Sequence, residues 1–264
     1  MRTCVSQSGA FASLVAVLAV LLGAVPEAAA QGPPPETGGP DFLFGPPGGS
    51  LAVRGGWVFA RAGSDVFEFV RDRLTIEDGD FNTAAFATDL GIALTRRADV
   101  VIGVDFSRAT VASEYREFVD NERLPIEQTT SLRQLNLTGS LRVALGPRGR
   151  EISSLAWIPR RVVPYAGAGG GMLWYTFRQV GDFVDEVAGT PATRPIFSDL
   201  FEAKAWTPSA HVFGGVDLKL YHRWFLTFDG RYVWAAGDLG QDFERFEPID
   251  LAGFRFGAGI NVLF

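Results

Sequence analysis

The chain contains 264 residues, and its 30 acidic side chains outnumber the 24 basic ones to give a net charge of −6. This acidic balance argues against nucleic acid as a partner, because nucleic-acid-binding surfaces are basic. Hydrophobic residues form 47% of the chain, yet after residue 30 they form no run that approaches the roughly 20 residues of a membrane-spanning helix. The single cysteine, Cys4, lies near the N-terminus. The sequence therefore indicates no disulfide and no thiolate chemistry, and we expect no metal site and no cofactor.

Residues 1–30 are typical of an export signal. Arg2 supplies a positive charge, Leu14–Val25 a short apolar core, and Ala28–Ala30 a cleavage site of small residues. We expect cleavage after Ala30; an uncleaved N-terminal anchor is the alternative. Residues 31–49 are rich in Pro and Gly, which predicts an extended linker before a single domain over residues 50–264. A tether suits this composition better than a proline-rich binding motif.

From residue 50 onward, apolar and polar residues alternate with a period of two, which is the signature of β-strands with two unlike faces. In the segment Val163–Phe177, this interpretation places Tyr165, Leu173, Tyr175 and Phe177 on the outward, apolar face. About eight such segments occur, the number of strands in the smallest outer-membrane barrels. They are Leu51–Ala60, Phe86–Leu94, Val100–Ser107, Gln134–Leu145, Val163–Phe177, Pro208–Leu220, Trp224–Trp234 and Leu251–Phe264.

The connections favour a membrane barrel over a soluble β-sandwich, which the alternation alone would also allow. Short connections alternate with long ones, and aromatic residues bracket the apolar rows as in a membrane girdle. We therefore predict an all-β, eight-stranded, antiparallel up-and-down transmembrane β-barrel. The short connections are Thr95–Asp99 and Tyr221–Arg223, and the long ones lie near 62–84, 113–130, 178–204 and 236–250. Residues 146–161 are a long connection at the end of the barrel where short ones are expected. They form either an interfacial segment or a plain long turn.

Charged side chains recur on the predicted inward face. An eight-stranded barrel is just wide enough for side chains to fill it, so charges inside it must pair. This predicts a salt-bridged, mostly closed lumen, with an open pore as the alternative. The predicted lumen residues are Arg54, Asp89, Asp105, Arg142, Asp217, Lys219, Asp229, Arg231 and Arg255.

Two of the long connections are strongly acidic. The first carries Asp65, Glu68, Asp72, Glu77, Asp78 and Asp80, and the last carries Asp238, Asp242, Glu244, Glu247 and Asp250. These carboxylates either are ordinary solvated loop residues or share divalent cations with lipid phosphates. Interleaved apolar residues predict that the loops cover one another or meet a partner; they are Val66, Phe67, Phe69, Val70, Phe243 and Phe246.

Three stretches resemble the small outer-membrane β-barrel families typified by OmpA, OmpX and OmpW. They are the aromatic last strand ending at Phe264, the glycine-rich Pro164–Gly171, and Phe228–Tyr232 before the final hairpin. The resemblance covers about residues 50–264 and implies insertion in the bacterial outer membrane, among lipids and lipopolysaccharide. It also implies that the outer-membrane assembly machinery recognises Phe256, Ile260 and Phe264.

Three functional classes follow. The first is a structural or surface-interaction barrel, and the second is a porin-like or OmpW-type channel for small or hydrophobic solutes. The third is an outer-membrane lipid-modifying enzyme, because some resembling barrels are lipid A deacylases that use a serine and a histidine. Ser209, His211 and Asp217 would be the candidates here. Since their side chains are predicted to point into the lumen, away from lipid, we expect the protein not to be an enzyme.

Overall fold

The computed structural model describes residues 42–77, 79–119, 123–153, 156–184, 195–243 and 245–264. The predicted export signal and most of the predicted linker lie outside these residues. Within the described linker, Leu43 is buried and pairs with Trp157 in an isolated bridge. No helix of the described residues combines the length and apolar character needed to cross a membrane.

The described chain is almost entirely strand. The strands are β1 (Gly49–Ala60), β2 (Thr83–Ala93), β3 (Ala98–Val119), β4 (Pro125–Ala144), β5 (Gly149–Ser153), β6 (Ala156–Pro159), β7 (Val162–Val184), β8 (Ile196–Tyr221), β9 (Trp224–Gly237), β10 (Ile249–Asp250) and β11 (Gly253–Leu263). One α-helix, α2 (Asp65–Arg73), and one 3-10 helix, η1 (Gln241–Phe243), occur among the described residues.

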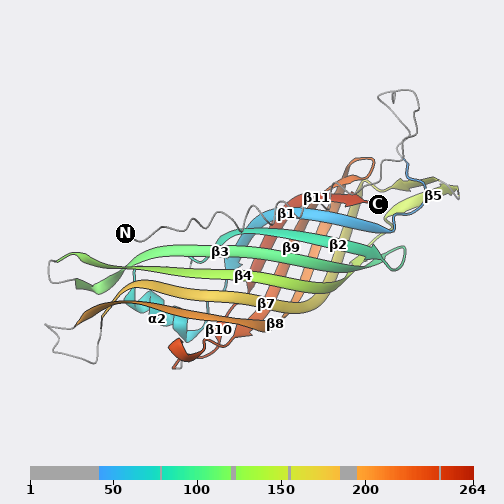
Figure 1. The fold of residues 1–264 in the computed structure, drawn as a ribbon. Helices are drawn as coiled ribbons and strands as arrows, with labels where there is room; N and C mark the ends of the chain where they lie inside the picture. Colours follow the sequence, from blue (N-terminus) through green and yellow to red (C-terminus); the bar gives the residue numbers. More distant parts are fainter. Residues whose placement is uncertain (1–41, 78, 120–122, 154–155, 185–194, 244) are drawn as a thin grey trace, which may run out of the picture. The chain divides into compact units, whose positions relative to one another are not determined.

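Eight of these strands close into a ring (Figure 1). Their order is β1-β2-β3-β4-β7-β8-β9-β11, every neighbouring pair is antiparallel, and β11 returns to pair with β1. Strands β1 and β11 close the ring, and Gly49 pairs with Phe264 at one end of it. We call that end of the barrel the terminal end. The opposite end, which carries α2, is the loop end. The predicted eight-stranded antiparallel barrel is therefore confirmed.

Large apolar side chains cover the outside of the barrel. Trp224 begins β9 and Trp234 lies near its other end, and they are 51% and 46% exposed. The two tryptophans are ten residues apart. At about 3.3 Å per residue, on a strand tilted by about 40° from the barrel axis, ten residues span about 25 Å along that axis, which is the height of the apolar band of outer-membrane barrels. Phe59 and Phe254 lie opposite each other at the loop-end edge of this band. The band therefore has the dimensions and aromatic edges that a bilayer requires.

The predicted faces of the fifth segment were wrong. Tyr165, Leu173, Tyr175 and Phe177 are all buried, whereas Met172 between them is 45% exposed. The prediction placed the row with the larger apolar side chains, which contains these four residues, against lipid. In β7 that row fills the interior instead, because Tyr165 meets the charged lumen and the other three pack into an apolar core at the loop end.

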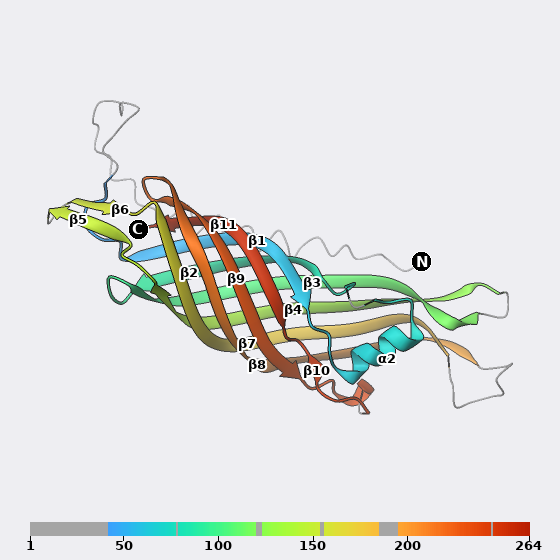
Figure 2. The ribbon, with the colours of Figure 1, turned by 180° about the vertical axis from the view of Figure 1, so that it is seen from behind.

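Two of the predicted long connections are strand instead. β3, β4, β7 and β8 run on past the barrel toward the loop end, so that most described residues near 113–130 and 178–204 are paired (Figure 1). Residues 146–161, expected as either an interfacial segment or a plain long turn, include the hairpin of β5 and β6 at the terminal end (Figure 2). The connection near 62–84 contains α2, which sequence interpretation missed.

Helix α2 is held by its buried face. Val66, Phe67 and Val70 are at most 1% exposed, and the Phe67 ring lies 4.8 Å from Phe81 and 5.8 Å from Phe177. Acidic residues begin the helix and basic residues end it, which matches the helix dipole. The helix therefore packs against the inward row of β7 and closes the loop end of the barrel with an apolar core.

The last long connection joins this core. Phe243 of η1 lies 5.6 Å from Phe177, and the Phe69 and Phe246 rings are 5.4 Å apart. The Asp65 carboxylate accepts the Glu247 backbone N–H at 3.0 Å. The two acidic connections thus cover one another, as their interleaved aromatic residues predicted.

Replacing Phe67 by alanine should open this core. Truncating a buried phenylalanine costs about 3–5 kcal/mol, so the segment 61–82 should become sensitive to trypsin at Arg71 and Arg73 while the barrel remains intact. Phe69→Ala is the matched control, because Phe69 is on the same helix and 43% exposed. Equal trypsin resistance of the Phe67→Ala variant and the control would contradict a closed loop-end core.

Candidate functional site

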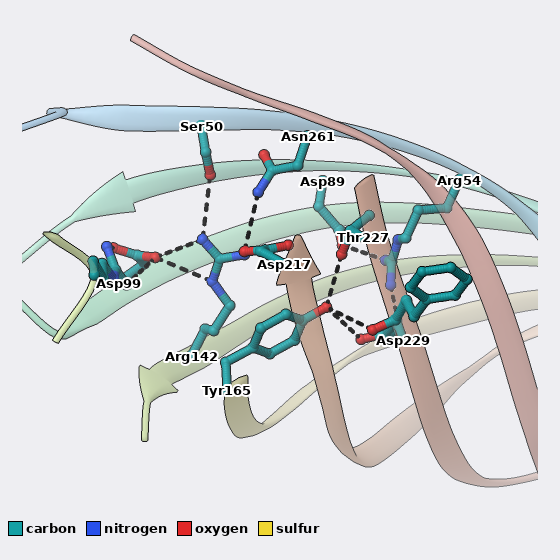
Figure 3. A network of polar contacts seen from close by, with 12 residues as sticks. Ser50, Arg54, Asp89, Asp99, Arg142, Tyr165, Asp217, Thr227, Asp229 and Asn261 are labelled. Atoms are coloured by element: carbon teal, nitrogen blue, oxygen red, sulfur yellow. Dashed lines mark hydrogen bonds and ion pairs between the residues drawn. The ribbon is translucent and has the colours of Figure 1, made fainter. Parts of the chain in front are cut away.

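The lumen contains a chain of ion pairs that begins at the terminal end. Arg142 of β4 donates to the Asp99 carboxylate at 2.8 and 3.1 Å, and Arg148 donates to it at 2.7 and 2.5 Å. Arg142 also lies 3.7 Å from Asp217 of β8, and its guanidinium lies 5.2 Å from the centre of the Tyr165 ring. Arg142 thus connects β3, β8 and β7 across the barrel (Figure 3).

A second cluster fills the middle of the lumen. Arg54 of β1 pairs with Asp89 of β2 and, at 2.5 Å, with Asp229 of β9. Arg231 lies 3.6 Å from Asp89 and 3.7 Å from Asp229. The Tyr165 hydroxyl bonds with Thr227 at 3.1 Å and reaches the Asp229 carboxylate at 3.4 Å (Figure 3). All four charged side chains are at most 14% exposed, so each has exchanged water for an opposite charge.

Further contacts cross the lumen between the charged clusters and the loop-end core. Arg255 of β11 pairs with Asp105 of β3 and donates to Gln134 of β4 at 2.7 Å. Ser209 of β8 donates to Asn136 of β4 at 2.9 Å. These bonds join strands that are not neighbours in the ring, so they tie the barrel together across its interior.

Of the nine predicted lumen residues, six are buried in the structure, and Asp89, Arg142 and Lys219 are partly buried. Lys219 lies at the terminal end of β8 and is only partly buried. The sequence interpretation missed two residues that take part in the ion pairs of the lumen, Asp99 and Arg148. Asp99 is 2% exposed and has the same strand parity as Asp105, so extending the third segment by one residue would have found it. Arg148 follows β4, and no alternation marks it. With these two, five aspartates face five arginines in the ion pairs described here.

Little room is left between these side chains. Cavities along the charged clusters have volumes of about 30, 10 and 20 Å³. Because a cavity needs roughly 10–15 Å³ to hold one water molecule, each accommodates at most a few waters. The charged part of the lumen is therefore filled by its own side chains.

The candidate hydrolase residues do not form one catalytic group. Ser209 bonds to Asn136, while His211 Nε2 lies 2.8 Å from the hydroxyl of Ser140, and Asp217 accepts from Asn261 at 3.3 Å. His211 is 1% exposed. The arrangement is a set of structural hydrogen bonds between strands.

The predicted assembly residues share one face of the last strand. Phe256 is 48% exposed and Phe264 58% exposed, with Ile260 partly exposed between them. They pack in the apolar band, where Phe256 lies opposite Trp57. Their recognition by assembly machinery stays a prediction.

The acidic loops do not form a metal site within the described residues, where no group of three or more His, Cys, Asp or Glu side chains gathers. Asp65 and Asp250 instead accept bonds from backbone N–H groups of the facing loop and turn.

Comparisons with known proteins give matches among solved structures alone. No family model and no curated protein matches the chain. Among solved structures, similar ones include Neisserial surface protein A (13% identity, TM-score 0.43, covering 82% of this chain and 96% of that one). The outer membrane protein OprG from Pseudomonas aeruginosa shares 10% identity (TM-score 0.44, 84% and 99%). Ail of Yersinia pestis, in complex with the heparin analogue sucrose octasulfate, shares 13% (TM-score 0.34, 81% and 98%).

The ring of eight antiparallel strands with an apolar exterior decides the fold. At the level of the fold, this chain is a small outer-membrane-type β-barrel. The fold expected from the resemblance to the OmpA, OmpX and OmpW families is thus confirmed.

The Asp105–Arg255 pair allows a direct energetic test. Asp105→Asn should lower the free energy of unfolding in detergent micelles by about 3–5 kcal/mol, because it leaves a buried arginine without its counter-charge. The double variant Asp105→Leu/Arg255→Met should recover most of this loss, since both charges are gone.

Glu202→Gln serves as the control in the same urea titration. It removes one partner of the exposed Lys204–Glu202 pair, for which we expect a change of at most about 1 kcal/mol. Equal effects of Asp105→Asn and Glu202→Gln would show that the lumen pair is not isolated from water.

Proposed function

We propose that this protein is an integral barrel of the bacterial outer membrane, with a structural or surface-interaction role and a closed lumen. The observation that carries the proposal is the filled interior. Paired charges occupy the membrane-spanning part, and α2 with the loop-end core occupies the mouth. A solute would have to separate buried ion pairs or displace this core in order to pass.

The membrane assignment rests on the exterior. An apolar band about 25 Å high with aromatic edges would be costly to expose to water. The export signal predicted for residues 1–30 agrees with this location. We infer that the terminal end faces the periplasm and that α2 and the extended strands face outward, where outer-membrane barrels carry their longer loops.

A surface-interaction role is supported by the strand extensions. Beyond the apolar band, β8 keeps β7 as its partner over Ile196–Trp206, while its pairing with β9 begins only at Ser209. Phe197 and Leu200 are 41% and 42% exposed there. A protruding sheet with exposed apolar side chains is a suitable contact surface for another molecule at the cell surface.

The channel and the enzyme remain alternatives with less support. An OmpW-type route for hydrophobic solutes would need space at the loop end, where Leu173, Tyr175 and Phe177 instead pack against α2. A lipid-modifying enzyme would need catalytic side chains within reach of lipid, and His211 is buried in the lumen.

Planar-bilayer recording tests the proposal. The wild-type protein should give no large steady conductance, because moving an ion through the lumen requires breaking desolvated ion pairs. Heat-modifiable migration on a gel should be checked on the same sample, so that a silent bilayer is not mistaken for unfolded protein. A large steady conductance, or swelling of liposomes in small sugars, would favour the channel and contradict a closed lumen.

A further inference from the structure

The largest cavity described here lies outside the lumen, at the terminal end. Its volume is about 510 Å³, within the range of roughly 300–1,000 Å³ typical of small-molecule sites. It lies between the turn that joins β2 to β3, the residues that lead into β5, and the segment Pro46–Gly48. Trp157 of β6 forms part of its wall.

The walls of this pocket are fastened in place. Trp157 is 7% exposed, and it exchanges two backbone hydrogen bonds with Leu43, at 2.8 and 2.9 Å. The hairpin of β5 and β6 is thereby tied to the chain that enters β1. Arg148, at the back of the pocket, is anchored on Asp99. The pocket is therefore part of the fold.

Its charge is positive. Arg96, Arg97 and Arg148 line it against the single acidic lining residue Glu151. Because Arg148 is paired with Asp99, Arg96 and Arg97 carry the positive charge available to a ligand. The Arg96 side chain is 84% exposed and lies 3.0 Å from Glu151. Because exposed ion pairs are weak, Arg96 can turn to an incoming anion. Arg97 is also exposed.

The surroundings strengthen this preference. The terminal end carries four more exposed arginines outside the pocket: Arg150, Arg160, Arg161 and Arg223. The exposed acids described above lie mostly at the opposite, loop end. An anion approaching the terminal end therefore meets a positive field.

The rim of the pocket indicates which anion fits. Leu94 lines the pocket and is 60% exposed, and it continues the outward apolar row of Leu90 and Ile92 on β2. An acyl chain lying along this row would place its phosphate beside the arginines. Arginine binds phosphate through parallel N–H donors.

We propose that this pocket binds the phosphate headgroup of an anionic phospholipid, with Arg96 and Arg97 as the ligating side chains. The proposal rests on the proposed function, since the terminal end must lie at the level of the lipid headgroups. A free phosphate shares the headgroup chemistry but would make no use of the Leu94 row.

The test uses the protein purified in a zwitterionic detergent and titrated with phosphatidylglycerol or phosphatidylcholine, with bound lipid counted by native mass spectrometry. Arg96→Gln/Arg97→Gln should weaken phosphatidylglycerol binding roughly 30-fold, because each arginine near anionic lipid contributes about fivefold. Arg223→Gln is the matched control, with an arginine at the same end but outside the pocket. It should bind within about twofold of the wild type. Arg148 is left intact because it supports Asp99.

Three results would overturn the site: unchanged binding by the double variant, an equal loss in Arg223→Gln, or wild-type binding of phosphatidylcholine as tight as that of phosphatidylglycerol. If the double variant does not fold, Arg97→Gln alone replaces it, with an expected loss of about fivefold. Competition by inorganic phosphate as effective as by the lipid would also contradict a lipid site. Heat-modifiable migration on a gel separates the two proposals. If the protein keeps this migration but the lipid-binding results contradict the site, only the pocket proposal fails and the barrel proposal stands.

Discussion

The structure depends on one constraint: a strand that shows an apolar face to lipid must turn its other face into a narrow closed space. Eight strands leave too little room for free water around charged groups. Every arginine that enters must therefore meet an aspartate from another strand. The Arg54, Asp89, Asp229 and Arg231 cluster meets this requirement by joining β1, β2 and β9. These pairs hold the ring together and fill its charged part, where the cavities have volumes of about 30, 10 and 20 Å³.

The interior changes character along the axis. Near the terminal end and the middle it is ionic, whereas from Leu173 to Phe177 of β7 it becomes apolar, because α2 supplies a hydrophobic face for it to pack against. The charge of the exterior also changes along the axis. Arginines surround the terminal end, and carboxylates dominate the loops. The molecule thus has a basic terminal end and a loop end whose two connections, near 62–84 and 236–250, are acidic.

The barrel could be predicted because lipid imposes strict alternation on each membrane-spanning strand, as in Gln134–Leu145. The prediction failed where that constraint ends. Residues 113–119 lie beyond the apolar band and carry polar side chains on both faces, so nothing in their pattern marked them as strand. Val66, Phe67 and Val70 have helical spacing after Ser64, a usable signal that the alternating segments around it obscured. The orientation of Tyr165 had no local signal, because only the charges from other strands determine it.

The central claim is that the outward rows meet acyl chains. Single cysteines carrying a nitroxide label, placed in a Cys4→Ser background at Leu137 and at Thr129, test it on one face of one strand. Both positions point outward on β4, and only Leu137 lies within the apolar band. In lipid vesicles, the label at 137 should be accessible to oxygen and shielded from a water-soluble nickel reagent, while the label at 129 should be accessible to nickel. Equal nickel accessibility at the two positions would contradict the account.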